Sequence, residues 1–198
     1  SFYNSSVIFD HCVFDRSLRG DDFLNVSRAQ FKISNTLFTN TNADAFDADF
    51  CSGELDHVTF NNIGNDGIDF SGTYAKFSHI KMSNVEDKGI SLGERSYVSG
   101  SEISIDHSEI ALASKDLTYI LFDKLSISDT KLGITAFQKK IEYGPAMIDI
   151  RELTQLNVEI PHLIEDNSQL LIEGKLQKTT SKSVKDILYG NLYGKKSK

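Results

Sequence analysis

Hydrophobic residues recur along the chain at intervals of about 22 positions. One apolar column contains Leu24, Phe46, Ile68, Ile90, Ile110 and Ile134. A second column contains Phe14, Phe38, Phe60, Met82, Ile105, Ile127, Ile150 and Ile172. Both columns keep their spacing to within about two residues over most of the chain, which is the signature of a repeat array.

Short alternating stretches within each repeat predict β-strands. Val58-Thr59-Phe60 and Ile103-Ser104-Ile105 alternate with a period of two, as expected for strands with one buried face. Helical solenoids need roughly 33–47 residues per repeat and helix-length apolar stripes. We therefore predict an all-β fold, a single-stranded parallel β-helix of about seven 22-residue coils over residues 1–174, whose columns become internal ladders.

A polar column supports this fold. It follows the second apolar column and contains Asn40, Asn62, Asn84, His107 and Asp129. Asparagine tolerates left-handed backbone and can share side-chain hydrogen bonds along a stack of turns. We interpret this column as structural.

Composition limits the function classes. The chain has 198 residues, 39% of them hydrophobic, enough for one domain with a sizeable core. No apolar run approaches the roughly 18–20 residues of a membrane helix, so we expect no transmembrane segment. A net charge of -7 argues against nucleic acid as a partner, because phosphate binding needs clustered cations. Two cysteines make neither a disulfide framework nor a zinc site.

The two ends of the chain differ. The repeat pattern begins almost mid-coil at Phe2, without a signal sequence, so we expect the chain to be part of a larger one. Residues 175–198 carry seven Lys and one Asp and form a predicted basic C-terminal cap or tail. Within it, Ser183 and Asp186 resemble an N-cap box, which predicts a short capping helix through Tyr189. The basic block is either a solvated tail or a contact for a polyanion.

Residues 41–70 carry the opposite charge, with seven Asp or Glu and no Lys or Arg. If Phe46 and Ile68 point inward, then Asp47 and Asp69 point outward from adjacent coils. The predicted acidic face contains five aspartates in all, namely Asp44, Asp47, Asp49, Asp66 and Asp69. Like charges about 5 Å apart should raise some of these pKa values unless a cation intervenes.

Three interpretations of this acidic face remain open. The five aspartates could bind Ca²⁺, a hard cation that takes several carboxylate oxygens. Two of them could act as a hydrolase acid/base pair, since adjacent coils supply a separation of roughly 5 Å. They could also be solvated positions that keep the fold soluble.

Four stretches resemble a known family, namely NIGNDGIDFSGT, DKGISLGERS, IALASKDL and GITAFQKKIEYGP. They look like right-handed parallel β-helix proteins of the pectate-lyase-like superfamily, and in particular like bacterial extracytoplasmic β-helix domains, some of them linked to CotH-type proteins. The resemblance implies a right-handed helix, an extracellular or cell-surface location and a polysaccharide or cell-wall polymer as partner. It also implies Ca²⁺ held by stacked aspartates, with Lys88 or Arg95 as a catalytic base.

We therefore expect a module that engages polysaccharide along an acidic face able to hold calcium. Asp47, Asp69, Glu94 and Tyr143 are the predicted ligand-binding residues, and Tyr143 lies in an excursion between coils that could form a groove wall. The alternatives are a calcium-dependent polysaccharide lyase or a hydrolase, and a noncatalytic spacer of a larger surface protein.

Two histidines lie one coil apart outside the acidic face. His57 and His79 precede Phe60 and Met82 by three residues each, so their imidazoles should stack outward. A metal site needs a third ligand, and none is evident from the spacing. We interpret them as a surface pair.

Overall fold

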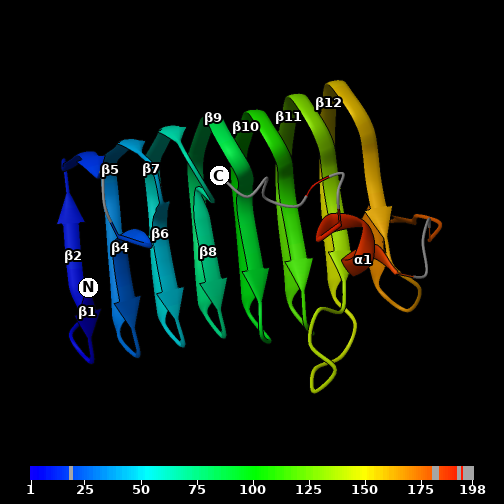
Figure 1. Cartoon of the computed structure of the whole chain (residues 1–198), viewed down its shortest axis with the longest axis horizontal. Coiled ribbons are helices and arrows are strands. Elements are labelled where there is room, and N and C mark those ends of the chain that lie inside the picture. The colour runs from blue at the N-terminus through cyan, green and yellow to red at the C-terminus, as the bar shows by residue number, and fades with distance from the viewer. Residues whose placement is uncertain (18–19, 180–182, 191–192, 194–198) are drawn as a thin grey trace.

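The chain folds into a parallel β-solenoid of about eight turns, stacked along the long axis of the molecule (Figure 1). The computed structural model describes residues 1–17, 20–179, 183–190 and 193. The predicted all-β parallel β-helix is confirmed. Within the described part of the chain, no helix is long and apolar enough to cross a bilayer.

One fourteen-stranded sheet winds through the coils. Its strands are β1 Phe2–Tyr3, β2 Val7–Asp10, β3 Val13–Ser17, β4 Asp22–Ser27, β5 Gln30–Thr41, β6 Asp44–Asp49, β7 Ser52–Ile63, β8 Ile68–Ser71, β9 Tyr74–Gly93, β10 Tyr97–Lys115, β11 Tyr119–Phe137, β12 Met147–Ile164, β13 Gln169–Ile172 and β14 Lys175–Leu176. Among the described strands, only the last pairing, β13 with β14, is antiparallel. The helix α1 spans Val184–Leu188.

The core is a set of ladders inside the coils. Phe14, Phe38, Phe60 and Met82 pair in register in successive coils, followed by Ile105 and Ile127. The rings of Phe14 and Phe38 stack at 4.6 Å, and those of Phe38 and Phe60 at 5.1 Å. Because no coil can bury its apolar face alone, this contact between neighbours holds the stack together.

Three residues do not belong to the ladders predicted for them. Ile90 pairs with Leu112 and not with Ile110, because the register shifts between Ser108 and Ile110. Ile150 pairs with Phe122 in a different ladder, and Ile172 pairs with Ile150 in that same ladder. The cause is one long coil: Tyr119 pairs with Met147, 28 positions later, whereas Tyr97 pairs with Tyr119 after 22.

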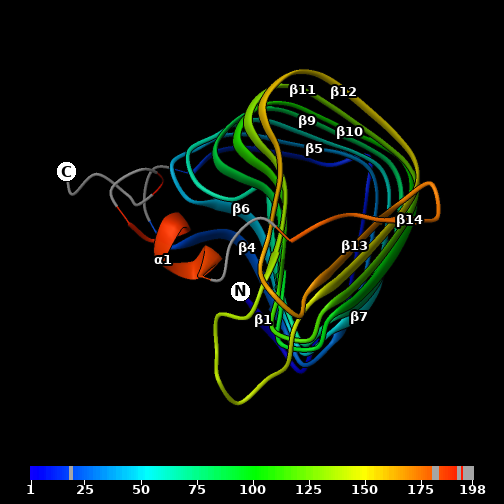
Figure 2. The same cartoon turned by 90° about the vertical axis from the view of Figure 1, so that its right-hand side faces the viewer.

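The corners of the coils use left-handed backbone. The φ angles of Asn40, Asn62 and Asn84 are 55°, 56° and 56°, and His107 and Asp129 continue the column at 51° and 49°. Left-handed backbone costs most L-residues energy, but asparagine and aspartate visit it readily. The predicted turn column is confirmed, and Figure 2 shows the coils superposed as a three-sided outline.

The helix α1 lies against the side of the stack (Figure 2). Val184 and Leu188 pack on outward-facing apolar residues of β10 and β11, namely Ile110, Ala113, Leu132 and Phe137. The predicted short helix is confirmed, and Ser183 at its N-cap donates a hydrogen bond to the Asp186 carboxylate. It covers a lateral face instead of the end of the last coil. Most of the remaining basic segment lies outside the described residues.

Candidate functional site

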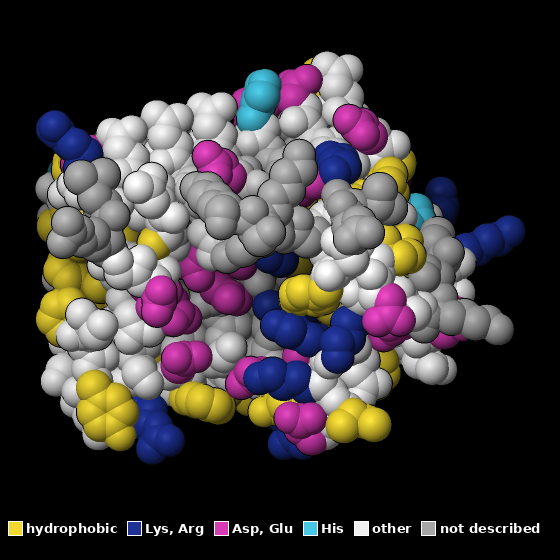
Figure 3. All heavy atoms as spheres, viewed as in Figure 1, with side chains coloured by type: hydrophobic (Ala, Val, Ile, Leu, Met, Phe, Trp, Pro, Cys, Tyr) yellow, Lys and Arg dark blue, Asp and Glu magenta, His cyan; other side chains and the backbone are white. Residues whose placement is uncertain are grey.

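Six aspartates occupy one lateral face of three adjacent coils. Asp22 lies on β4, Asp44, Asp47 and Asp49 on β6, Asp66 just before β8, and Asp69 on β8. The strand register aligns Asn25, Asp47, Asp69 and Ser91 in one row along the solenoid axis. Figure 3 shows acidic side chains gathered beside a group of lysine and arginine side chains. We call this surface the acidic face.

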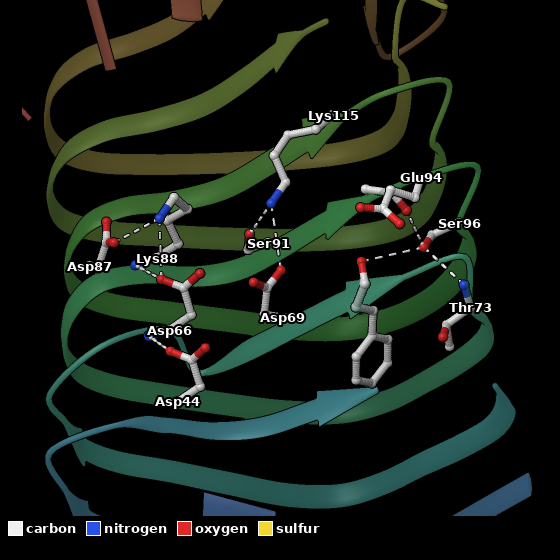
Figure 4. Close-up of polar contacts among 12 residues, drawn as sticks. Asp44, Asp66, Asp69, Thr73, Asp87, Lys88, Ser91, Glu94, Ser96 and Lys115 are labelled. Carbon is white, nitrogen blue, oxygen red and sulfur yellow. Dashed lines mark hydrogen bonds and ion pairs between the residues drawn. The ribbon is translucent and has the colours of Figure 1, made fainter. Parts of the chain in front are cut away.

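Lys88 neutralises one end of the acidic face. Its Nζ lies 3.3 Å from the Asp66 carboxylate and 2.7 Å from that of Asp87, and Asp66 is only 4% exposed (Figure 4). Asp66 also accepts a hydrogen bond from the Lys88 backbone N–H at 3.1 Å. Burial alone would lower the pKa of Lys88, but Asp66 and Asp87 outweigh it and raise that pKa. The Lys88 ammonium is therefore held in its charged form, which disfavours a role as catalytic base.

Lys115 supplies a second cation from later in the chain. Its side chain is buried, donates a hydrogen bond to Ser91 Oγ at 2.8 Å and lies 3.5 Å from the Asp69 carboxylate (Figure 4). Buried lysines are uncommon unless paired. The acidic face is thus compensated at Asp66 and Asp69.

Three other carboxyl groups of the acidic face lack such compensation within the described residues. Among the described residues, no lysine or arginine forms an ion pair with Asp22, Asp47 or Asp49. Burial, the neighbouring Asp49 and other acidic groups raise the pKa of Asp47 to about 8, although Asn25 donates a hydrogen bond to it at 2.7 Å. Burial and Asp44 raise the pKa of Asp22 to about 6. The predicted pKa rise within this face therefore has a structural cause at Asp47.

A loop over residues 138–146 borders the face on one side. The backbone N–H groups of Lys139 and Lys140 both donate to the buried carboxylate of Asp116 at 2.7 Å. The Lys140 ammonium pairs with Glu94. Two of the predicted residues lie at this contact: Glu94 belongs to the turn after β9, and Tyr143 belongs to the loop. The Arg95 guanidinium lies 5.7 Å from the centroid of the Tyr143 ring.

A cleft of about 410 Å³ opens between the face and α1. Its lining residues are Asn65, Asp66, Asp69, Asp87, Lys88, Ile110, Lys115, Lys139, Leu188, Tyr189 and Tyr193. Lys139 Nζ lies 5.0 Å from the centroid of the Tyr189 ring, which is 47% exposed. The cleft therefore combines carboxylates, ammonium groups and an accessible aromatic wall, and its volume lies in the range of small-molecule sites.

The predicted calcium ligands are not drawn together as one cluster. Within the described part of the chain, two groups of at least three His, Cys, Asp or Glu bring their ligand atoms within 4.8 Å of one another, and neither includes an aspartate of the acidic face. Asp44 and Asp66 instead accept hydrogen bonds from the backbone of the following coil. Asp47 and Asp49 retain the oxygen donors that Ca²⁺ prefers, so calcium binding stays a prediction for these two, and the structure places Asp22 beside them.

Sequence reasoning located the acidic face but missed part of the cleft. Lys115, Asp87, Tyr189 and Tyr193 were not among the predicted site residues. Lys115 carries a usable signal, because it directly follows a run of small and apolar residues, Ile110–Ser114, within the same strand. Tyr189 and Tyr193 reach the face only through the fold of the C-terminal segment, for which the repeat period gives no information.

No family model matches the chain, and no curated protein or solved structure is similar enough to it to indicate a relationship.

Proposed function

We propose that this β-solenoid is a polysaccharide-engaging module, and that the cleft between α1 and the acidic face is its binding surface. The observation that carries the proposal is the lining of the cleft, where Asp69, Lys115 and Tyr189 meet. We extend the proposal to an extracytoplasmic location and to the pectate-lyase-like superfamily, on the basis of the sequence resemblance alone.

The chemistry of the cleft suits a sugar chain. Carboxylates accept hydrogen bonds from sugar hydroxyls, and ammonium groups donate them or pair with the carboxylate of an acidic sugar. The Tyr189 ring presents an apolar face with a polar edge, which fits the amphipathic surface of a pyranose. Because successive coils repeat at about 4.8 Å, similar groups recur along the axis at a spacing near that of one sugar residue.

The lysines favour an acidic polysaccharide over a neutral one. Lys88 is paired with two carboxylates, whereas Lys139 contacts the Tyr189 ring and forms no ion pair with a described carboxylate. Its charge is thus available at the rim of the cleft, where an anionic sugar would add a charge-assisted contact.

Binding can be measured by calorimetry with soluble acidic and neutral polysaccharides. Tyr189→Leu and Lys139→Met change the cleft wall without touching the buried Lys88 and Lys115 pairs. We expect each to weaken binding of an acidic polysaccharide by about ten-fold, a loss near 1.4 kcal/mol. Tyr74→Leu is the matched control, because Tyr74 is 61% exposed and lies outside the cleft. Equal affinity for the wild type, both cleft variants and the control would refute this binding surface.

A hydrolase is the second candidate, favoured by the pairing of Asp47 with Asp69. The two residues lie in register on adjacent coils, and the carboxyl groups of retaining glycosidases lie about 5–5.5 Å apart. The raised pKa of Asp47 suits a proton donor to the glycosidic oxygen, and Asp69 beside Lys115 would be the nucleophile.

Product analysis separates these functions. New reducing ends that disappear in both Asp47→Asn and Asp69→Asn indicate hydrolysis. Unsaturated products indicate a lyase, for which the sequence resemblance implies Lys88 or Arg95 as the base. Binding without either product supports the noncatalytic module, and neither binding nor turnover supports a spacer.

A further inference from the structure

A second group of polar side chains occupies a corner of the solenoid away from the acidic face. His57 and His79 hold equivalent corner positions in adjacent coils, each with a φ of 53°. Their rings stack with centroids 4.1 Å apart and planes 16° from parallel. The acidic face lies between the corners at Asn62 and Gly72, so the histidines mark the third corner.

The fold supplies the third ligand that the sequence spacing does not reveal. An Asp56 carboxylate oxygen lies 2.9 Å from His57 Nδ1 and 3.5 Å from His79 Nδ1. The three ligand atoms all lie within 4.8 Å of one another. In a tetrahedral zinc site with bonds of about 2.0–2.1 Å, neighbouring ligand atoms are separated by roughly 3.3–3.4 Å. The observed distances lie on either side of that value.

We propose that Asp56, His57 and His79 form a binding site for a divalent transition-metal ion of the zinc class. Two imidazoles and one carboxylate suit this class, whereas calcium and magnesium prefer oxygen ligands alone. About half of each side chain is exposed, which leaves further coordination positions open to water or to an outside ligand.

Neighbouring side chains stabilise the ionised form of the Asp56 carboxylate. Partial burial raises the pKa of Asp56, but hydrogen bonds from Ser78, His57 and His79 outweigh it and lower that pKa. The Ser78 hydroxyl oxygen also lies 2.8 Å from His79 Nδ1, within hydrogen-bond distance. When that nitrogen binds a metal, the Ser78 hydroxyl remains available to Asp56, and such outer hydrogen bonds orient metal ligands.

The same corner two coils earlier provides an internal comparison. There, Asp10 and His11 take the places of Asp56 and His57, and the Asp10 carboxylate lies 2.8 Å from His11 Nδ1. In the next coil, Asn35 takes the place that His79 has beside His57. Asn35 donates its amide to Asp10 at 3.0 Å. The solenoid thus accommodates an asparagine at this position with left-handed backbone. His79→Asn therefore reproduces an arrangement that the fold already contains.

The test is Zn²⁺ titration of the full chain by calorimetry, with Co²⁺ absorption to report coordination geometry. We expect His79→Asn, His57→Asn and Asp56→Asn each to lower Zn²⁺ affinity at least about ten-fold and to remove the tetrahedral Co²⁺ bands.

His107→Asn is the matched control. His107 lies beside Asp106 and Asp129 at another corner and offers a single imidazole. Circular dichroism establishes that each variant keeps its strand content. Wild-type affinity in His79→Asn, loss of binding in His107→Asn, or a Co²⁺ spectrum without tetrahedral bands would each overturn the proposed site.

Discussion

The Lys115 ammonium lies 3.5 Å from the Asp69 carboxylate, although a complete coil separates the two residues. Ser91, in the intervening coil, accepts a hydrogen bond from the same ammonium at 2.8 Å. One side chain thus connects three successive coils across the floor of the cleft. This connection compensates one carboxylate of the acidic face, whereas Asp22, Asp47 and Asp49 form no ion pair with a described lysine or arginine.

A double-mutant cycle should detect the Lys115–Asp69 contact. Lys115→Met and Asp69→Asn, singly and together, are expected to give a coupling free energy of about 1 kcal/mol, because Lys115 is buried and Asp69 is partly exposed. Urea denaturation followed by circular dichroism measures it. Lys124 and Glu102 form an exposed pair at 3.4 Å, for which the same cycle should give less than about 0.5 kcal/mol. Equal coupling in both pairs would contradict the structural role of Lys115.

The raised pKa of Asp47 predicts a pH dependence of stability. The unfolded carboxyl titrates near pH 3.9, whereas the folded one titrates at about 8. Between these values the native state binds more protons, so this group makes the free energy of unfolding fall as the pH rises from about 4 to 8.

Asp47→Asn removes that dependence. Its free energy of unfolding should match the wild type near pH 4 and exceed it near pH 8, by an amount on the order of 2 kcal/mol. Denaturation at both pH values measures the difference. The matched control is Asp123→Asn, which removes an exposed carboxylate paired with Arg151 at 2.7 Å. A variant less stable than the wild type at pH 8 would show that the Asp47 carboxylate is not destabilised by its neighbours.

Calcium binding should depend on Asp47 and Asp49, which form no ion pair with a described lysine or arginine. Asp47→Asn and Asp49→Asn are expected to lower calcium affinity by about ten-fold, because both side chains would supply oxygen ligands. Asp66→Asn should have a smaller effect, since that carboxylate is engaged by Lys88. Calorimetric titration measures each affinity. Absence of heat, together with a Tm insensitive to calcium and chelator, would remove calcium from the proposed function.

The left-handed corners should constrain substitution. Asn62 has a φ of 56° and donates its amide to Asn40 at 3.2 Å. Asn62→Ala should destabilise the fold by about 1 kcal/mol, because alanine is unfavourable in left-handed backbone. Asn62→Gly should lose less, since glycine adopts this conformation freely. Thermal unfolding of the two variants gives the comparison, and equal Tm values would argue against backbone conformation as the cause.

The repeat architecture was predictable because identical requirements recur in each coil. Phe38 and Phe60 must face inward at the same place, and Asn40 and Asn62 must turn the chain at the same corner. A periodic physical constraint leaves a periodic pattern in the sequence. The acidic face was predictable for the same reason, since Asp47 and Asp69 follow directly from the inward positions beside them.

Features that break the period could not be predicted in this way. The register shift at Ser108 moves Ile110 out of the ladder, and the long coil beginning at Tyr119 moves Ile150 into another. Contacts that skip a coil, such as that of Lys115, leave no signal at the repeat spacing. Asp56 as a partner of His79 became visible only when the corner geometry placed them together.

The long coil also shows where the fold tolerates added chain. Residues 138–146 extend outward from the solenoid, while β11 and β12 on either side keep a continuous parallel register. Cross-section and length are therefore independent properties of this architecture. Insertions that leave the stack at a corner can diversify the surface, and insertions of a whole coil can lengthen the molecule, without disturbing the ladders already formed.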